Sequence, residues 1–337
     1  MYKSHYQLAK QPFGMTPDPA LLFMTASHRE ALAGLAYAIL ERKGFIALVG
    51  DAGTGKTTLV ARILGHLPTG RVQSSVILNP TLSCAEFLEM MMVDFGMTDI
   101  PASKASRVNR LQKFLLQGHT ENKISVLVVD EAHKLSLEVL EEIRLLGNLE
   151  FSEHKLLQIV LAGQSELGHL LNRPEMRQLK QRFAVRLNIE ALSNPDVEQY
   201  IVFRWTKAGG RRPTPFSSGA IDEITRFSKG IPRVINCLCD NALMRVYGHG
   251  ESQVTGQDIV SVARELDLLD TVVMPVVTEP LPAPLPAVEP VAVSVGAPPV
   301  LARGGIQTLE RYDRPAPRPS FFSRWVWRLG RVNGNGG

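Results

Sequence analysis

The sequence is poor in cysteine and has no long hydrophobic run. Its 337 residues include three cysteines, Cys84, Cys237 and Cys239, an odd number without the spacing of a metal site or a disulfide framework. We therefore expect three reduced, small side chains. No segment reaches the roughly 18 apolar residues of a transmembrane helix, and the first residues lack the apolar core of a signal peptide. These absences favour a cytoplasmic protein.

An excess of charge of either sign is also missing. Lys and Arg number 37 against 33 Asp and Glu, a net charge of +4 that does not by itself indicate nucleic-acid binding. Residues 271–337 hold seven Arg and four acids, or +3, which leaves 30 basic and 29 acidic residues, or +1, before them. The 45% hydrophobic and 21% charged fractions are ordinary for a globular protein, so the chain as a whole is not collagen-like, disordered or a disulfide scaffold.

Proline and the hydrophobic pattern divide the chain into four parts. Half of the 22 prolines lie in the last 67 residues, where a stretch of Pro, Ala and Val favours extended conformations that cannot form a core. We expect a domain boundary near Asp270. The predicted parts are an α/β domain at 1–192 with an N-terminal extension at 1–27, a helical domain at 193–270, a disordered linker at 271–319 and a short aromatic and basic segment at 320–337.

Short apolar runs alternate with helical patterns in the first part. Runs rich in β-branched residues, separated by helices, predict a parallel sheet buried on both faces and thus a doubly wound α/β domain. The five predicted strands are 45–49, 74–78, 125–129, 156–162 and 184–189. After Ser193 the strand runs stop, and helices are predicted at about 196–208, 217–228, 232–247 and 256–268.

The strongest motif, GDAGTGKT, directly follows the first predicted strand. Its glycines let backbone N–H groups surround phosphate oxygens, and the next helix offers its N-terminus to the same anion. Lys56 would neutralise the β- and γ-phosphates, and the Thr57 hydroxyl would ligate Mg²⁺. The predicted residues for ATP and Mg²⁺ are Gly50, Asp51, Ala52, Gly53, Thr54, Gly55, Lys56, Thr57 and Thr58.

Polar residues follow two further predicted strands. Asp130 and Glu131 end the run VLVVDE, at the sheet edge where open α/β proteins bind ligands. Asp130 would hold Mg²⁺ through water, and Glu131 would polarise the attacking water. Gln164 ends the fourth run and can orient that water, with Asn148 a weaker candidate for the same neighbourhood. We expect His133 to be a structural polar residue.

Arginines outside these motifs are candidates for stabilising charge in the transition state. Arg177 and Arg182 lie just before the fifth predicted strand, and Arg233 starts a helix of the second domain. An arginine supplied across an interface accelerates phosphoryl transfer by ~10³–10⁵. Because a lone arginine is usually solvated surface, the order of residues alone does not choose among them.

The combined motifs resemble those of the AAA+ ATPases and, more closely, the general secretion pathway protein A ATPases. The resemblance covers nearly all of residues 1–265 and is carried by Tyr6–Leu8, Pro12–Phe13, Thr16–Pro19, His28–Leu32, Gly50–Thr57, Val129–Ala132, Leu161–Leu167, Gln181–Phe183 and Gly230–Asn236. It implies a five-stranded sheet of order 5-1-4-3-2, a helical lid, ATP bound between core and lid, and a homo-oligomeric ring or filament.

The resemblance also implies roles for single residues. Gln164 matches the first sensor, and Arg233 matches the second, which touches the γ-phosphate from the lid. Arg182 matches the region of the arginine finger that acts on a neighbouring subunit, with Arg177 as the second choice. Pro17 and Phe23 are expected to wall the adenine pocket.

Three functions follow from these features. The first is an ATPase that drives self-assembly and remodels a protein partner in a secretion or cell-envelope (exopolysaccharide) system. The second, by resemblance to transposition helper ATPases, is a DNA-bound regulator that uses the basic cluster Arg204, Lys207, Arg211 and Arg212, unless this cluster is only a solvated face. The third is a nucleotide-dependent scaffold with little hydrolysis.

The aromatic and arginine residues at 321–331 add a separate expectation. They favour a peripheral contact with the inner membrane, docking on a partner, or a flexible end. Secretion-type relatives often continue into a membrane span and a cell-wall-binding domain, and from the sequence we expect neither here.

Overall fold

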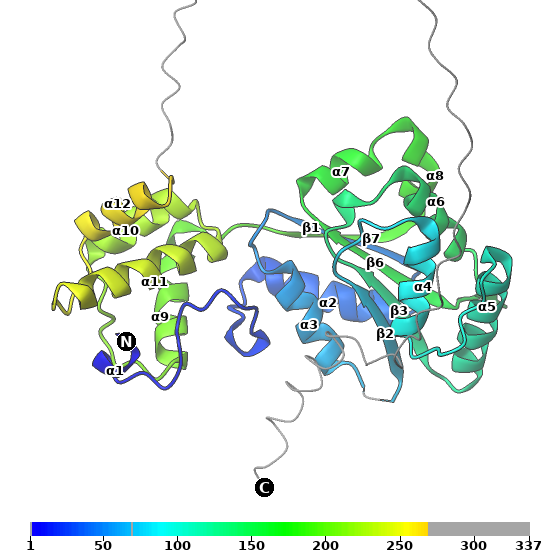
Figure 1. The fold of residues 1–337 in the computed structure, drawn as a ribbon, viewed down its shortest axis with the longest axis horizontal. Helices are drawn as coiled ribbons and strands as arrows, with labels where there is room; N and C mark the ends of the chain where they lie inside the picture. The colour runs from blue at the N-terminus through cyan, green and yellow to red at the C-terminus, as the bar shows by residue number, and fades with distance from the viewer. Residues whose placement is uncertain (1, 69, 269–337) are drawn as a thin grey trace, which may run out of the picture. The chain divides into compact units, whose positions relative to one another are not determined.

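The computed structural model describes residues 2–68 and 70–268 of the chain. Figure 1 shows a sheet flanked by helices, followed along the chain by a group of helices. The expected linker at 271–319 and the segment at 320–337 lie outside the described residues, as does the end of the predicted lid.

Five parallel strands form the main sheet. They are β1 (Phe45–Gly50), β2 (Val72–Ile77), β3 (Ile124–Val129), β6 (Leu157–Gly163) and β7 (Phe183–Ile189). Their order in the sheet is β2-β3-β6-β1-β7. The strands β4 (Glu150–Phe151) and β5 (His154–Lys155) form a separate small hairpin. If only the strands of the main sheet are numbered along the chain, β6 becomes the fourth and β7 the fifth. Read from the β7 edge, the order is then 5-1-4-3-2, as the resemblance implied. Each predicted run is a strand.

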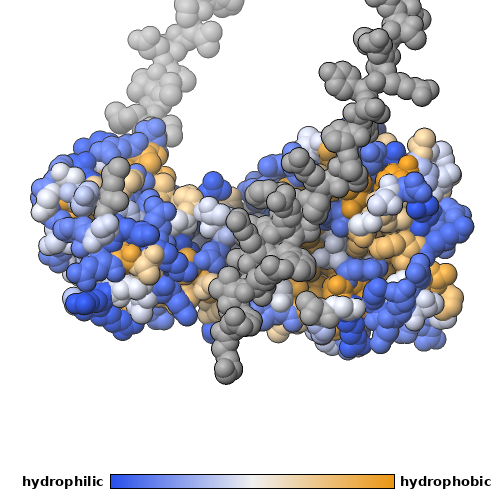
Figure 2. All heavy atoms as spheres, turned by 60° about the horizontal axis from the view of Figure 1, so that its bottom comes forward, coloured by the Kyte–Doolittle hydropathy of each residue, from blue (hydrophilic) through white to orange (hydrophobic). Residues whose placement is uncertain are grey.

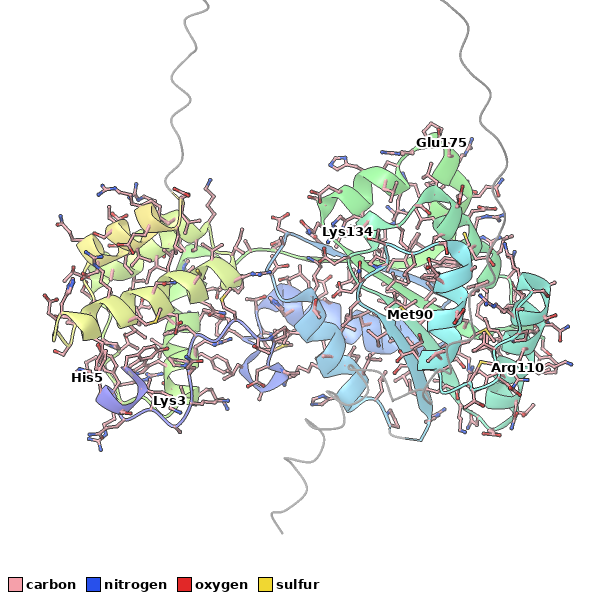
Figure 3. All side chains as sticks on the ribbon, in the orientation of Figure 1. Lys3, His5, Met90, Arg110, Lys134 and Glu175 are labelled. Atoms are coloured by element: carbon pink, nitrogen blue, oxygen red, sulfur yellow. The ribbon has the colours of Figure 1, made fainter. Side chains whose placement is uncertain are left out.

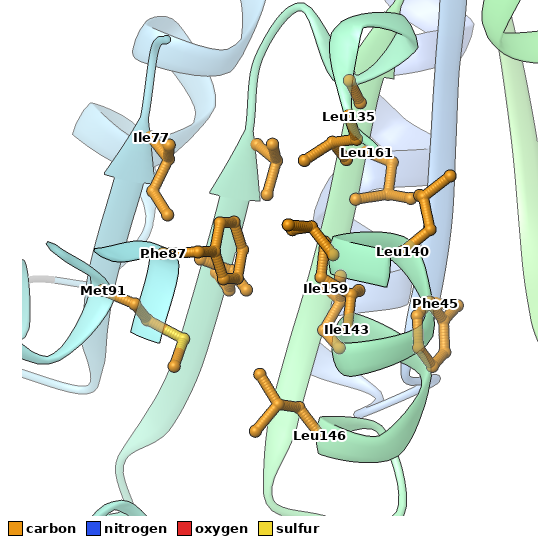
Figure 4. Close-up of a cluster of buried hydrophobic side chains, with 14 of the residues drawn as sticks. Phe45, Ile77, Phe87, Met91, Leu135, Leu140, Ile143, Leu146, Ile159 and Leu161 are labelled. Carbon is orange, nitrogen blue, oxygen red and sulfur yellow. The ribbon is translucent and has the colours of Figure 1, made fainter. Parts of the chain in front are cut away.

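Helices cover both faces of this sheet because successive strand residues point to opposite sides. On one face, Ile46 and Leu48 pack with α2 (Ala26–Leu40) and α3 (Lys56–His66). The other face carries α4 (Cys84–Asp94), α5 (Lys104–Thr120), α6 (Leu137–Leu146) and α7 (Ser165–Leu171). Figure 4 shows Phe87 and Ile143 from this second layer against the strands. Burying each such side chain contributes roughly 1.5–3 kcal/mol.

The four helices that follow the sheet along the chain begin at recognisable start signals. They are α9 (Asn194–Lys207), α10 (Ser218–Ser228), α11 (Pro232–Gly248) and α12 (Gly256–Glu265). Ser217 and Thr255 cap α10 and α12, and Pro232 opens α11, where its missing N–H costs nothing. Just before α11, Gly230 has φ 74°, and a Cβ there would lie 2.0 Å from the Leu192 carbonyl oxygen.

The first residues of the chain pack among these later helices. Tyr2, Leu8 and Phe13 are buried in the hydrophobic cluster of α9–α12, and the Tyr2 hydroxyl donates to the Asp240 carboxylate. Figure 3 labels Lys3 and His5 on α1 (Tyr2–His5), the short helix that contacts α11. The division drawn from the sequence attached residues 1–27 to the α/β domain, whereas their first half joins the helical cluster.

The face drawn in Figure 2 is mixed: hydrophilic residues are interspersed with hydrophobic patches, the broadest of which lie in the right half of the view. Among the helices of residues 2–68 and 70–268, none is both long and apolar enough to cross a membrane. All three cysteines are free thiols, as their number and spacing predicted.

Candidate nucleotide-binding site

The glycine-rich loop joins β1 to α3 in a conformation that glycine permits. Gly53 has φ 81° and Gly55 has φ 102°, values that residues with a Cβ rarely adopt. A Cβ on Gly50 would lie 2.5 Å from the Ile189 carbonyl oxygen, so the loop starts pressed against the neighbouring strand. The Thr54 hydroxyl and main-chain N–H both donate to the Asp51 carbonyl oxygen, at 2.9 and 3.3 Å. The loop is thus a closed, pre-shaped turn.

Lys56 begins α3 and is buried, with 5% of its surface exposed. Its Nζ donates to the carbonyl oxygens of Gly50 at 2.7 Å and Asp51 at 2.9 Å. Burial lowers the pKa of the Lys56 ammonium, and the charges of Asp130 and Glu131 oppose that shift. A phosphate group would satisfy this desolvated cation better than neutral carbonyl groups do.

Asp130 connects the end of β3 to the loop. Only 6% of its surface is exposed, and its carboxylate accepts the Thr57 hydroxyl at 2.5 Å and the Glu131 main-chain N–H at 2.9 Å. Hydroxyl and carboxylate oxygens are the ligand types that Mg²⁺ prefers. The Thr57–Asp130 pair therefore fits a magnesium site beside the loop.

Glu131 is held by three side chains. Its backbone adopts φ 52°, a left-handed conformation that costs about 1–3 kcal/mol for a residue with a Cβ. Its Oε2 accepts from Gln164 Nε2 at 3.3 Å and pairs with Lys134 Nζ at 3.3 Å. The third contact is His133 Nε2 at 3.5 Å. Figure 3 labels Lys134, which belongs to the short turn after Glu131.

Gln164 follows β6 and precedes α7, so it reaches the same sheet edge as Asp130 and Glu131. Its main-chain N–H donates to His133 Nδ1 at 3.4 Å, and its Nε2 lies 3.4 Å from His133 Nε2. The predicted grouping of Gln164 with Glu131 is therefore present. The sequence carried no signal that the ring of His133 would bridge the two.

A cleft of about 370 Å³ opens over the loop. Arg233, at the start of α11, lines it and donates its main-chain N–H to the Gly53 carbonyl oxygen at 3.3 Å. Pro17 and Phe23 also line it, as expected for a wall of the base pocket. The remaining lining residues come from the loop, the N-terminal segment and the helices, and include Met15, Leu22, His28, Thr58, Leu192, Tyr200, Arg204 and Asn236.

Arg182 lies at the opposite end of the strands from the glycine-rich loop. Arg182 precedes β7, whose first residue, Phe183, pairs with Phe45 at the start of β1. The glycine-rich loop follows the far end of β1, about 16 Å away at 3.3 Å per residue. Arg182 donates to the Arg144 carbonyl oxygen at 3.0 Å and to Asn148 Oδ1 at 2.5 Å.

Two further candidates do not join the loop. Asn148 pairs with Arg182, so the expectation that it lies near Asp130 was wrong: it follows a helix, and the rule that groups the carboxyl ends of strands does not apply to it. Arg177 is exposed at the start of the short helix α8 (Arg177–Lys180).

The basic cluster considered for DNA does not form one exposed face. Arg204 is 7% exposed and donates to the carbonyl oxygens of Pro12 at 2.6 Å and Gly14 at 3.3 Å. It thereby ties the N-terminal segment to α9 at the wall of the cleft. Lys207, Arg211 and Arg212 are exposed.

Comparisons with known proteins agree with this geometry. Residues 39–171 match the family described as an AAA domain. The five-stranded sheet, the glycine-rich loop after β1 and the acidic pair after β3 accompany that match. Residues 39–171 therefore form an AAA domain, which is a nucleotide-binding fold.

Individual known proteins are similar to the chain over most of its length. The chain is 40% identical over 267 residues to the "General secretion pathway protein A" of Aeromonas hydrophila, covering 79% of this chain and 48% of that one. It thus spans about half the length of this relative. It is also 28% identical over 263 residues to the "ATP-dependent target DNA activator B" of Escherichia phage Mu, covering 75% of each. The crystal structure of Cdc6p from Pyrobaculum aerophilum shares the fold, with a TM-score of 0.60 and 14% identity over 77% of this chain and 71% of that one.

Proposed function

We propose that the chain hydrolyses ATP with Mg²⁺ and uses the cycle of binding and hydrolysis to assemble with itself and to remodel a protein partner. The observation that carries this proposal is the contact between Thr57 and Asp130, which joins the phosphate loop to the acidic pair that includes Glu131. A phosphate site and a candidate base thus share one edge of the sheet. We assign residues 1–192 to the nucleotide-binding domain and 193–270 to the lid, except that the first half of residues 1–27 packs with the lid.

Binding would rest on the loop and its flanking residues. The N–H groups of the loop and the N-terminus of α3 offer donors to the phosphates, and Lys56 would exchange its two carbonyl partners for phosphate oxygens. Thr57 would ligate Mg²⁺ directly and Asp130 would do so through water. When bound, Mg²⁺ neutralises charge on the phosphates.

Hydrolysis would rest on Glu131 and Gln164. Glu131 would accept a proton from the attacking water, and Gln164 would hold that water in place. In the described structure the Glu131 carboxylate is paired with Lys134, which competes for the same oxygen. Release of that pair would therefore be part of activation. Arg233 would contact the γ-phosphate from the start of α11.

The position of Arg182 supports a shared site. About 16 Å of sheet separates it from the loop of its own chain, so it can serve as an arginine finger only for a neighbouring subunit. We propose Arg182 for this role, with Arg177 second, in a ring or filament of identical subunits.

The name of the relative from Aeromonas hydrophila supports a role in a secretion system. We keep a cell-envelope (exopolysaccharide) system as part of the same proposal. A second candidate is DNA-dependent action, favoured by the similarity to a target DNA activator over three quarters of both chains. Because Arg204 is buried, a DNA-binding surface on this part of the chain would consist of Lys207, Arg211 and Arg212.

The test is steady-state ATP turnover across a protein concentration series, with and without duplex DNA at fixed low salt. A specific rate that rises with concentration and does not change with DNA supports the partner-remodelling function, whereas strong stimulation by DNA supports the second candidate.

Lys56→Ala should abolish nucleotide binding, and Glu131→Gln should bind ATP without turning it over. Normal turnover in the Glu131→Gln variant would refute the assignment of the base. Tight ATP binding with negligible turnover at every concentration would instead indicate a nucleotide-dependent scaffold.

A further inference from the structure

His28 belongs to a motif that carries the family resemblance but has no role in the site described so far. It lies in the first turn of α2, with 1% of its surface exposed, and lines the cleft. Its Nε2 lies 3.1 Å from the Thr54 carbonyl oxygen in the glycine-rich loop. Its Nδ1 lies 2.6 Å from the Thr25 hydroxyl oxygen. The imidazole therefore bridges the start of α2 and the phosphate loop.

The partners of the ring determine where its proton lies. A carbonyl oxygen can only accept a hydrogen bond, so Nε2 carries the hydrogen and donates to Thr54. Nδ1 of the neutral ring then accepts from the Thr25 hydroxyl. Burial lowers the pKa of the His28 imidazole, which favours this neutral form. Thr25 is fixed in turn, since its hydroxyl oxygen also caps α2 by accepting the His28 main-chain N–H at 3.3 Å.

This hydrogen bond fixes one peptide plane of the loop. In a trans peptide the carbonyl oxygen and the following N–H point in opposite directions. With the Thr54 carbonyl oxygen held by His28, the Gly55 N–H points away from the ring. Gly55 at φ 102° lacks the steric restraint of a side chain, so its conformation has to be fixed by contacts of this kind. A Cβ on Gly55 would lie 3.6 Å from His28 Nε2, so the ring packs closely against it.

We propose that His28 is a positioning residue that presets the Thr54–Gly55 peptide of the loop for binding the phosphate chain of ATP. This inference rests on the proposed function, because it assigns His28 to the same site. The loss should appear in nucleotide affinity more than in the maximal rate, because His28 holds the loop rather than the attacking water.

The experiment compares His28→Phe, which keeps the ring volume, with His28→Gln, whose side-chain amide can still donate to Thr54. A fluorescent ATP analogue with Mg²⁺ is titrated against each variant and the wild type, and KM and kcat are measured for ATP. We expect Kd and KM to rise about 3- to 10-fold in His28→Phe, the range set by the loss of one hydrogen bond, with kcat changed less than twofold. His28→Gln should recover most of the affinity.

Several outcomes would overturn the proposal. One is wild-type affinity in His28→Phe, which would mean that only the shape of the ring matters. Another is equal impairment in His28→Phe and His28→Gln, which would mean that a donor to Thr54 does not restore the loop. If His28→Phe does not fold, a second pair of variants is used. Thr25→Val removes the hydroxyl that donates to His28 Nδ1, whereas Thr25→Ser keeps it. Equal nucleotide affinity in these two variants would also refute the proposal. Lys56→Ala is measured alongside: wild-type binding in that variant would refute the proposed nucleotide site itself.

Discussion

Replacement of Gly53 by alanine tests how closely the phosphate loop approaches the start of α11. The new Cβ would lie 2.7 Å from Arg233 Cβ and 3.1 Å from Ile231 Cγ2. Overlap of this kind costs about 1–3 kcal/mol, and the backbone at φ 81° adds about 1–2 kcal/mol for a residue with a side chain. The sum, about 2–5 kcal/mol, exceeds what the hydrogen bond from the Arg233 N–H to the Gly53 carbonyl oxygen contributes, about 0.5–1.5 kcal/mol. We therefore expect the loop and α11 to separate in Gly53→Ala.

Gly65→Ala is the matched control. Gly65 lies in α3, nothing lies within 4 Å of the position its Cβ would take, and alanine there should stabilise the helix by about 0.5–1 kcal/mol. The assays are chemical denaturation and steady-state ATP turnover. Gly53→Ala should unfold at lower denaturant and lose at least 10-fold in turnover, because a displaced Arg233 no longer reaches the γ-phosphate. A Gly53→Ala protein with wild-type stability and turnover would refute the reasoning.

The remaining predictions concern three other residues. Arg182→Ala alone should bind ATP normally but turn over poorly, and mixing it with Glu131→Gln should restore activity, because the second variant supplies the finger to the intact site of the first; no gain on mixing would argue against a shared site. Arg204→Met should lower the free energy of unfolding by about 2–4 kcal/mol in denaturant titrations, because two carbonyl oxygens lose a charged donor, whereas the exposed Arg212→Met should change it by less than about 0.5 kcal/mol. Because burial lowers the pKa of His28, the unfolded chain takes up its proton first, so stability present above the unfolded value of about 6.5 should be lost as the pH falls below it. His28→Gln should flatten the pH dependence of the melting temperature in this range, and an unchanged slope would contradict the prediction.

The sheet and the phosphate loop could be predicted because local pattern and tertiary position agree there. β3 is buried at every residue, and a continuous apolar run bounded by polar residues is what such a strand requires. The carboxyl ends of parallel strands share one edge, so the meeting of Glu131 with Gln164 followed from strand order.

Other parts depended on contacts between distant residues that no local pattern reveals. Arg204 lies beside other basic residues in the sequence, and only the distant carbonyl oxygens of Pro12 and Gly14 account for its burial. Tyr2 likewise belongs to no recognisable apolar pattern, and its partner, Asp240, is 238 positions away. Asn148 was misplaced because a residue after a helix is not positioned by the order of the strands.

Because the first residues pack among helices α9–α12, they cannot reach their final packing until those helices have been synthesised. Phe13 shares its cluster with Ala263, so at about 5–20 residues per second its final neighbours emerge roughly 10–50 s after it does. All five strands of the main sheet leave the ribosome before that moment, while the apolar N-terminal segment has no helices to cover it. The wall of the cleft at Gly14–Phe23, anchored by Arg204, is therefore completed only after α9 has been made. A nascent chain can gain its phosphate loop early, but it acquires a complete pocket only after α9 and the start of α11 have been made.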